Sequence, residues 1–336
     1  MLKAAVIGCG AIHELHACAI AENQLVTLKT VCDCIEERAK KTAEQFSCGY
    51  TVSFDEVLAD PEIDVIHICT PHYLHAPMAI AAMEHGKDVF CEKPMAIHAE
   101  DARAMLDTAK KTGRVLGICF QNRYRSCVKK ARELLDSGEL GALLGARASV
   151  YWKRDRAYYA SGDWRGKWDT EGGGVLINQS IHTLDLLNWL CGGAIELKAH
   201  VDTFELGDCI EVEDTAMVNL RFPGGKNALF AATNVYAADS PIEVELVCEK
   251  GTLTIKEELT VKTPNGTAVY QDEALPGLGK AVWGGTHRMI IEDFYRCLTG
   301  DIPFAVDGGQ GICTVELLDA IYTSDRENRY VRVGEK

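Results

Sequence analysis

The first 120 residues alternate short apolar runs with helix-like patterns. The apolar runs cover residues 3–8, 26–33, 64–70, 88–92 and 115–120, and the helix-like stretches cover residues 11–22, 35–46, 74–86 and 99–113. Strands separated by helices of this length are typical of a parallel sheet with helices on both faces. We therefore expect an α/β, doubly wound fold at the N-terminus.

The pattern changes after Asn122. One helix-like stretch, residues 128–141, leads into longer runs with partial alternation, and two further helix-like stretches close the chain. The alternating runs are residues 142–152, 195–205, 214–222, 227–235 and 242–248. Such alternation indicates antiparallel strands covered on one face. We predict two domains, residues 1–122 and an α+β domain of residues 123–336.

Bulk properties narrow the class of protein. The chain has 336 residues, 47% of them hydrophobic, and a formal net charge of −14, which argues against a nucleic-acid partner. It enters a strand pattern at once and holds no run of 18 apolar residues, so we expect no membrane partner. Its 14 cysteines are scattered without a C-x-x-C pair, which favours free thiols in a cytoplasmic protein.

A glycine-bearing turn follows the first apolar run. Gly8 allows a tight turn, and Gly10 lets a pyrophosphate approach the backbone of Ala11 and Ile12 at the start of the next helix. His13 stands where the fingerprint usually has a third glycine or alanine. The loop predicts dinucleotide binding.

Asp33 ends the second apolar run, 23 residues after Gly10. A carboxylate there can accept hydrogen bonds from the adenosine ribose hydroxyls and would repel a 2′-phosphate. The alternatives are that Asp33 is only a helix cap and that Arg38 reaches a 2′-phosphate. We predict NAD rather than NADP.

The stretch EGGGVLINQSIHTLDLLNWL, residues 171–190, carries Asn178 and His182 one helical turn apart in an apolar run. A separation of four residues would place both side chains on one side of a helix. His182 is then either a satisfied core histidine or part of the wall of an active site.

Several motifs together resemble one family. They are VIGCGAIHELH, ICTPHYLHAPMAIAAMEHGKDVFCEKPMA, DWRGKWDTEGGGVLINQSIHTLDLL, VEDTAMVNLRF and HRMIIEDFYRCLTGDIPFAVDGGQG. Over its whole length the chain resembles the glucose–fructose oxidoreductase, inositol dehydrogenase and MocA family (Gfo/Idh/MocA). The resemblance implies an N-terminal Rossmann domain that binds a nicotinamide cofactor. It also implies a second domain with an open, mostly antiparallel sheet that binds substrate and mediates oligomerisation.

The resemblance also implies site residues. Those near the cofactor are Thr70, Pro71, His72, His75, Glu92, Lys93, Asn122, Trp164, Arg165 and Trp283. Many relatives carry an aspartate where this chain has Asn178. A neutral amide cannot relay a proton but can bind a sugar hydroxyl, so this departure argues against transferring an inositol dehydrogenase assignment.

Lys93 follows a short apolar strand, at the edge where open α/β sheets bind ligands. A partly desolvated lysine there can share a proton with a substrate hydroxyl. The alternative is a surface lysine in a loop.

We predict an NAD-dependent oxidoreductase that acts on a secondary hydroxyl of a sugar, sugar derivative or cyclitol. Lys93 and His182 would be catalytic, Asn178 would orient a neighbouring hydroxyl, and no catalytic metal is expected. Further polyol contacts are predicted from Arg123, Tyr124, Tyr151, Lys153, Arg156, Tyr158, Tyr159 and His287. The alternatives are a redox-neutral NAD-using glycoside-cleaving enzyme and a non-catalytic NAD-binding regulator.

Too few helices follow residue 195 to cover both faces of the second sheet. A bare apolar face invites a second copy of the chain, so we expect a homo-oligomer, a dimer or a tetramer.

Overall fold

The computed structural model describes residues 1–272, 284–300 and 302–335. Within these residues, no helix combines the length and the apolar character that crossing a membrane requires. The chain divides into two compact units, each formed from two separate segments. The first unit is Met1–Gln121 with Leu275–Ile312, and the second is Asn122–Ala274 with Cys313–Lys336.

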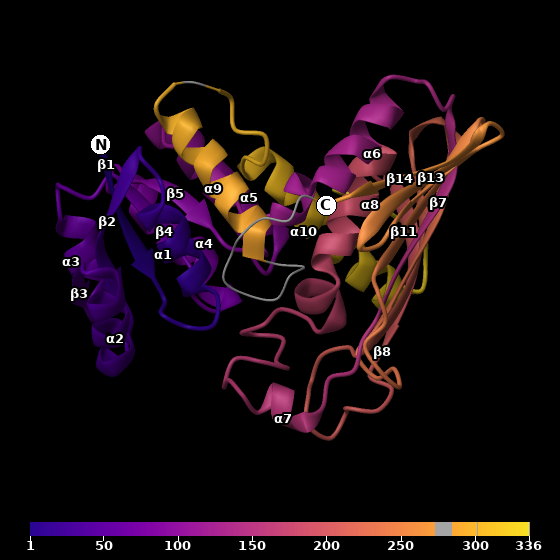
Figure 1. Ribbon diagram of the computed structural model, residues 1–336. Coiled ribbons are helices and arrows are strands. Elements are labelled where there is room, and N and C mark those ends of the chain that lie inside the picture. Colours follow the sequence, from indigo (N-terminus) through magenta and orange to yellow (C-terminus); the bar gives the residue numbers. More distant parts are fainter. Residues whose placement is uncertain (273–283, 301, 336) are drawn as a thin grey trace. The chain divides into compact units, whose positions relative to one another are not determined.

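The first unit is built on a parallel sheet. Six strands of the described residues lie in the order β3-β2-β1-β4-β5-β6 (Figure 1). They are β1 (Leu2–Ile7), β2 (Val26–Cys32), β3 (Gly49–Thr51), β4 (Val65–Ile68), β5 (Asp88–Cys91) and β6 (Leu116–Ile118). The intervening helices are α1 (His13–Ala21), α2 (Glu36–Phe46), α3 (Phe54–Ala59), η1 (His72–Leu74), α4 (His75–Glu84) and α5 (Ala99–Thr112). The predicted doubly wound fold is confirmed.

Local chemistry explains these elements. Ala4, Ala5 and Val6 of β1 are fully buried, as expected where a parallel sheet is covered on both faces. Helix α5 has acidic residues in its first turn, basic residues in its last, and the left-handed Gly113 after it, which match the helix dipole and the usual C-terminal cap. The strand order reverses between β1 and β4, so the switch point that binds ligands in such sheets lies at their carboxyl ends.

The first unit is completed by helix α9 (Gly284–Leu298), which packs on α1. Phe294 and Tyr295 of α9 are fully buried. The ring of Phe294 lies 5.0 Å from that of Phe90 in β5, and a Cβ added at Gly117 in β6 would meet the Phe294 ring at 2.8 Å. From its position in the sequence this helix was expected in the second domain. Aromatic packing on β5 and β6 instead holds it to the first unit.

The second unit is built on a mixed, mostly antiparallel sheet. Nine strands of the described residues lie in the order β14-β13-β12-β11-β7-β10-β9-β8-β15, with β7 and β10 parallel. They are β7 (Leu143–Tyr151), β8 (Glu196–Asp202), β9 (Thr215–Arg221), β10 (Asn227–Thr233), β11 (Glu243–Cys248), β12 (Gly251–Ile255), β13 (Glu258–Thr263), β14 (Gly266–Gln271) and β15 (Val331–Arg332). The remaining helices are η2 (Gln121–Tyr124), α6 (Ser126–Asp136), α7 (Arg156–Tyr159), η3 (Val175–Gln179), α8 (Ile181–Cys191), η4 (Pro223–Gly225) and α10 (Gly308–Glu327).

This sheet is covered on one face, as predicted. Along β9, Ala216, Val218 and Leu220 are buried, whereas Met217 between them is 62% exposed. Helix α8 packs on β7 and β11, and α6 packs on β12, β13 and β14. Figure 1 shows both helices on the same side of the sheet.

Candidate active site

The turn after β1 is shaped by two glycines with different surroundings. Gly8 has a φ of +92°, and a Cβ added there would lie 2.7 Å from the carbonyl oxygen of Cys69. At Gly10, by contrast, no atom of the described residues lies within 4 Å of an added Cβ. Gly8 is therefore required by the turn itself, whereas Gly10 borders open space.

His13 replaces the third glycine of the fingerprint and begins α1. Its Nδ1 lies 2.5 Å from the carbonyl oxygen of Gly10, and its Nε2 lies 3.0 Å from the hydroxyl of Thr42 in α2. The imidazole thus ties the turn to the neighbouring helix.

Asp33 follows β2 and is 8% exposed. Its Oδ2 accepts a hydrogen bond from the Cys9 N–H at 2.7 Å, and its Oδ1 accepts one from the Ile35 N–H at 2.8 Å. Ile35 itself is the N-cap residue of α2, so Asp33 supports the segment before that helix. Arg38 lies on α2 and is exposed.

The loops after β4 and β5 are joined by His75. Its Nε2 lies 2.9 Å from the carbonyl oxygen of Thr70, and its Nδ1 lies 2.7 Å from that of Pro94. Thr70 itself has a buried side-chain oxygen with no hydrogen-bond partner among the described residues. His72 is buried in η1, directly after Pro71. The histidine therefore holds together two loops at the carboxyl ends of the strands.

Glu92 follows β5 and is 6% exposed. Its Oε1 lies 2.9 Å from His16 Nε2 and 3.6 Å from His287 Nε2, and its Oε2 accepts a hydrogen bond from the Lys93 backbone N–H at 3.2 Å. Burial alone would raise the pKa of Glu92, but the hydrogen bonds from His16 and His287 hold that pKa well below its usual range. Glu92 is thus a buried carboxylate that fixes the backbone of Lys93.

A chain of side chains leads to Glu92. The Tyr295 hydroxyl lies 2.7 Å from His67 Nε2, and His67 Nδ1 lies 2.9 Å from His16 Nδ1. Burial lowers the pKa of both histidines, so both rings are neutral and each has one donor and one acceptor. One assignment satisfies all three contacts: Tyr295 donates to His67, His67 donates to His16, and His16 donates to Glu92.

Four potential metal ligands lie in this cluster. Ligand atoms of His16, Glu92, Cys119 and His287 are within 4.8 Å of one another. In the assignment above, His16 Nε2 carries a proton, and burial raises the pKa of the Cys119 thiol well above its ordinary value. A metal would have to displace both protons. The contacts therefore favour a hydrogen-bonded network, and a site without a catalytic metal stays our prediction.

The first unit fits a bound dinucleotide. The open space at Gly10 would let a pyrophosphate approach the backbone, and the side-chain oxygen of Thr70 is a buried polar atom that a ligand would satisfy. Asp33 fixes the Cys9 N–H in the same turn. Asn122, which begins the second unit, likewise has both side-chain amide atoms buried without a hydrogen-bond partner in the described part of the chain.

In the second unit, Asn178 and His182 lie on two successive segments. Residues Val175–Gln179 form a π-helical turn, in which the Ser180 N–H donates to the Val175 carbonyl at 2.8 Å, and α8 begins at Ile181. The single α-helix expected from the sequence is therefore interrupted just before His182. Such π-turns often occur at functional sites.

Two glycines before the π-turn are in close contact with the rest of the unit. A Cβ added at Gly173 would lie 2.1 Å from the Tyr322 hydroxyl, and one added at Gly174 would lie 1.8 Å from the backbone oxygen of Glu213. The Glu213 carboxyl accepts hydrogen bonds from the N–H groups of Gly174 (2.9 Å) and Leu176 (3.0 Å) and from the Tyr322 hydroxyl (3.1 Å). Burial raises the pKa of Glu213 to about 7 despite these donors. Glu213 therefore anchors the start of the segment that carries Asn178.

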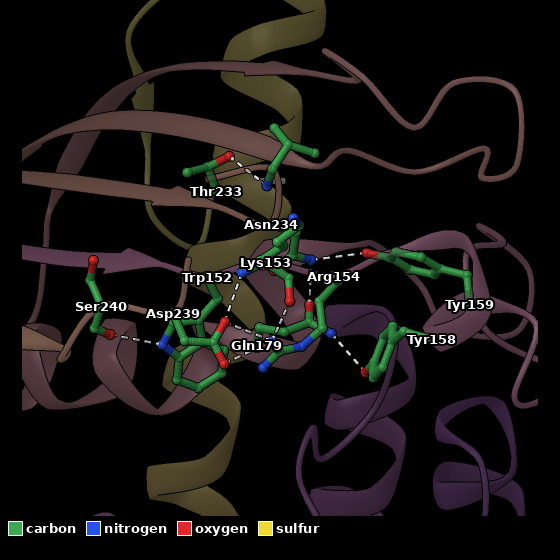
Figure 2. Close-up of polar contacts among 11 residues, drawn as sticks. Trp152, Lys153, Arg154, Tyr158, Tyr159, Gln179, Thr233, Asn234, Asp239 and Ser240 are labelled. Atoms are coloured by element: carbon green, nitrogen blue, oxygen red, sulfur yellow. Dashed lines mark hydrogen bonds and ion pairs between the residues drawn. The ribbon is translucent and has the colours of Figure 1, made fainter. Parts of the chain in front are cut away.

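Polar side chains converge around the Tyr158 hydroxyl. It lies 2.8 Å from Gln179 Nε2, 3.4 Å from Asn178 Nδ2 and 2.6 Å from Arg165 Nη1. Figure 2 shows the neighbouring contacts, in which Asn234 donates to the Tyr159 hydroxyl and to Gln179 Oε1, each at 2.9 Å. These contacts place Asn178 in a polar network of the second unit.

The other predicted substrate residues are distributed more widely. Arg123 forms two hydrogen bonds with Asp185 of α8, at 2.8 and 2.5 Å, and Arg156 pairs with Asp208 at the surface. His287 lies beside Glu92 in the first unit. Tyr124 is buried in η2, Tyr151 contacts the ring of Tyr236, and the backbone N–H of Lys153 donates to Asp239 (Figure 2).

Two predicted cofactor residues, Trp164 and Arg165, lie in the loop after α7, where the guanidinium of Arg165 is 4.6 Å from the Trp164 ring centre. Trp283 lies outside the described residues.

Sequence reasoning missed several residues of these networks. They are His16, His67, Glu171, Gln179, Glu213, Asn234, Tyr295 and Tyr322. Two of them had a local signal, since Glu171 directly precedes the three glycines and Gln179 directly follows Asn178. The others join the site through contacts between residues far apart in the sequence.

Comparisons with known proteins agree with the fold. Residues 2–120 match the family described as "Oxidoreductase family, NAD-binding Rossmann fold", and residues 128–254 match the "GFO/IDH/MocA C-terminal domain". Levoglucosan dehydrogenase of Pseudarthrobacter phenanthrenivorans is 26% identical over 99% of this chain and 98% of its own length. The 1,5-anhydro-D-fructose reductase of Ensifer adhaerens is 30% identical over 70% of each chain.

A solved structure is similar over the whole fold. The WlbA dehydrogenase of Bordetella pertussis, solved with NADH and UDP-GlcNAcA, matches with a TM-score of 0.88 and 28% identity, covering 100% of this chain and 99% of that one. The family models match residues 2–120 of the first unit and 128–254 of the second, and the residues of the first unit fit the dinucleotide. The chain therefore belongs to the Gfo/Idh/MocA family of oxidoreductases and is an NAD-dependent enzyme.

Proposed function

We propose that the protein oxidises a secondary hydroxyl of a sugar, a sugar derivative or a cyclitol. The observation that carries this proposal is the polar network around Asn178 and Tyr158, since its amide and phenol groups suit a polyol. The relatives support the same class, because levoglucosan, 1,5-anhydro-D-fructose and UDP-GlcNAcA, named for three of them, are carbohydrates.

NAD, when bound, supplies the acceptor for the hydride that leaves the hydroxyl-bearing carbon. We assign its pyrophosphate to the backbone of residues 8–12 and its adenosine ribose to Asp33. The remaining cofactor contacts are assigned to Thr70, Pro71, His72, His75, Glu92, Lys93, Asn122, Trp164 and Arg165. The same assignments make residues 1–122 the core of the cofactor domain and residues 123–336 the source of most substrate contacts.

The chemistry on the substrate falls to two side chains. The Lys93 ammonium donates a hydrogen bond to the reacting oxygen, His182 takes the hydroxyl proton, and the carbon becomes a carbonyl as the hydride departs. Asn178 binds a neighbouring hydroxyl. Glu92 supports Lys93 by holding its backbone N–H. Arg123 and Arg156 carry less of the proposal, because Asp185 and Asp208 already hold their guanidinium groups.

We further propose a cytoplasmic homo-oligomer that forms through the second sheet. The face of this sheet that points away from α6 and α8 carries Met217 and Leu229, which are 62% and 58% exposed. A second copy of the chain would cover them. Light scattering at micromolar concentration tests this, and a monomer would contradict it.

The function is tested by incubating the enzyme with NAD and a panel of sugars, glycosides and cyclitols. Absorbance at 340 nm reports reduced cofactor, and mass spectrometry identifies the products. Net reduced cofactor supports the dehydrogenase. Released aglycone without reduced cofactor would indicate the glycoside-cleaving alternative, and no turnover with intact NAD binding would indicate a regulator.

The roles of Lys93 and His182 are tested by substitution. Lys93→Ala and His182→Ala should each lower kcat by about 10²–10⁴-fold while NAD still binds. The double variant should lose less than the product of the two, because both groups act on one oxygen. His85→Ala and Lys110→Ala, which change exposed residues, are the matched controls. Normal turnover by His182→Ala would identify a core histidine and overturn the mechanism.

A further inference from the structure

The third position of the glycine fingerprint is where this chain departs from the usual pattern. His13 stands there as the first residue of α1, three residues after Gly10. A glycine at this position lets the helix pack closely on the strand and offers no side chain to the turn. The half-buried imidazole of His13 instead contacts the turn at Gly10 and the next helix, α2, at Thr42.

The partner atoms define how His13 makes these two contacts. The Gly10 carbonyl can only accept a hydrogen bond, so His13 Nδ1 carries a proton in the 2.5 Å contact with it. A neutral ring then accepts at Nε2 from the Thr42 hydroxyl, 3.0 Å away, whereas a charged ring donates to the same hydroxyl. Thr42 is therefore a partner of the imidazole in either charge state of the ring.

The contact with Gly10 restrains a peptide plane of the turn. The Gly10 C=O and the Ala11 N–H belong to one planar trans peptide, in which the two bonds point in opposite directions. Holding the carbonyl toward His13 therefore sets the direction of the Ala11 N–H. An added Cβ at Gly10 would meet no atom of the described residues within 4 Å, so no packed side chain supports the turn from that side.

Thr42 is also connected to the turn through Cys9, the residue between the two glycines. Burial raises the pKa of the Cys9 thiol to about 11, although its hydrogen bond with the Thr42 side chain acts in the opposite direction. The backbone N–H of Cys9 donates to Asp33 at 2.7 Å. Thr42 is itself buried. The turn is thus held from α2 by Thr42 and from the end of β2 by Asp33.

We propose that His13, held in turn by Thr42, is a positioning residue for the dinucleotide, because it fixes the Gly10–Ala11 peptide with the Ala11 N–H directed at the pyrophosphate. The proposal rests on the assignment of the pyrophosphate to residues 8–12 under the proposed function. It has a consequence that runs against the fingerprint: restoring the usual glycine at position 13 weakens NAD binding in this chain.

Calorimetric titration of the purified enzyme with NAD tests the proposal without any substrate. His13→Ala removes both contacts and should raise the Kd for NAD about fivefold, as expected for the loss of one hydrogen bond. His13→Gly should weaken binding at least as much, since glycine also frees the backbone. ADP-ribose, which keeps the pyrophosphate but lacks the nicotinamide, should show the same loss.

The role of Thr42 is tested with a pair of variants. Thr42→Val removes the hydroxyl but keeps the shape of the side chain, and it should raise the Kd for NAD about threefold. Thr42→Ser keeps the hydroxyl and should bind NAD as the parent does. The double variant His13→Ala/Thr42→Val should lose less than the product of the two single losses, because both residues act on the same peptide.

His85→Ala is the matched control. His85 Nδ1 also contacts a backbone carbonyl, that of Ala81 at 2.8 Å, but it does so where α4 ends before β5. Its loss should leave the Kd for NAD unchanged.

An unchanged Kd in His13→Ala, or tighter binding by His13→Gly, overturns the proposal. Where His13→Ala does not fold, equal binding of NAD by Thr42→Val and Thr42→Ser overturns it instead. Failure of the pyrophosphate assignment is distinguishable from both outcomes, because Gly10→Ala would then also bind NAD as tightly as the parent.

Discussion

Two glycine-bearing segments of the molecule differ in what surrounds the glycine. Beside Gly10 in the first unit, the described residues leave open space where a side chain would project, whereas Gly174 in the second unit is pressed against the backbone of Glu213. A side chain at Gly10 would meet no atom of the described residues, whereas the missing Cβ at Gly174 lets two parts of the same chain approach each other. A glycine motif in a sequence does not distinguish these cases.

The acids beside the two turns differ in the same way. Glu92, near the ligand-binding edge of the first sheet, is held ionised by imidazole donors. Glu213 receives two backbone N–H groups and a phenol, yet burial raises its pKa to about 7. The first acid holds the backbone N–H of Lys93, and the second anchors the start of the π-turn.

The largest effect is expected from Gly174→Ala. Its Cβ would overlap the Glu213 backbone oxygen at 1.8 Å, and backbone cannot move aside as a flexible side chain can. We expect a loss of at least about 4 kcal/mol or failure to fold. Urea unfolding measures this, with Gly10→Ala as the matched change in open space. Equal stability of the two variants would contradict the comparison.

The two buried acids should respond oppositely to pH. The pKa of Glu213 is raised from 4.5 to about 7 in the folded state, so its contribution is fully present below 4.5 and is lost as pH rises through 7. The stability of the parent relative to Glu213→Gln should therefore fall by on the order of 3 kcal/mol from pH 4.5 to pH 8.

Glu92 has a lowered pKa, so its contribution is present above 4.5 and is lost only at lower pH. The difference in unfolding free energy between the parent and Glu92→Gln should therefore stay constant from pH 5 to pH 8. Thermal unfolding of the parent, Glu213→Gln and Glu92→Gln from pH 4.5 to pH 8 measures both stability differences. A difference between the parent and Glu213→Gln that does not change with pH would refute the raised pKa of Glu213.

Gly10→Ala should leave the fold intact and weaken NAD binding. The added methyl group meets no atom of the described residues but would occupy the space assigned to the pyrophosphate. We expect an unchanged melting temperature and a Kd for NAD at least about tenfold higher. Calorimetric titration measures the affinity, and unaltered binding would show that the open space serves another purpose.

The smallest effect concerns the choice of nucleotide. The parent should bind NAD about tenfold more tightly than NADP, because the Asp33 carboxylate repels a 2′-phosphate. Arg38→Ala should leave that ratio unchanged, whereas Asp33→Ser should narrow it. Equal or tighter binding of NADP by the parent would mean that Arg38 sets the preference.

Periodicity was sufficient to predict most of the first unit. Strands such as β1 and helices such as α5 carry their pattern within a few residues. Strand β14 was missed because its side chains are all exposed and show no alternation in burial. Helix α9 was recognised as a helix, but its attachment to the first unit depends on Phe294 packing on Phe90, which are far apart in the sequence.

The candidate site was also predicted only in part, because some of its residues lie in local motifs and others join it through contacts between distant parts of the sequence. Motifs singled out Gly10, Asp33, Lys93 and Asn178 as candidate site residues, since each lies in a recognisable local pattern. Glu213 could not be identified, because the sequence does not distinguish a buried glutamate from a glutamate at the surface until its partners are known. The π-turn before α8 was also missed, since a pattern of apolar residues does not distinguish it from an α-helical turn.

Because α9 belongs to the first unit, that unit cannot complete its packing until late in the synthesis of the chain. Residues 1–121 leave the ribosome early, but the phenol that donates to His67 and the ring that covers Phe90 belong to residues 295 and 294. At about 5–20 residues per second, the ribosome needs on the order of ten seconds to reach them. During that interval Phe90 and His67 lack these partners, and the nascent chain offers a hydrophobic surface to chaperones.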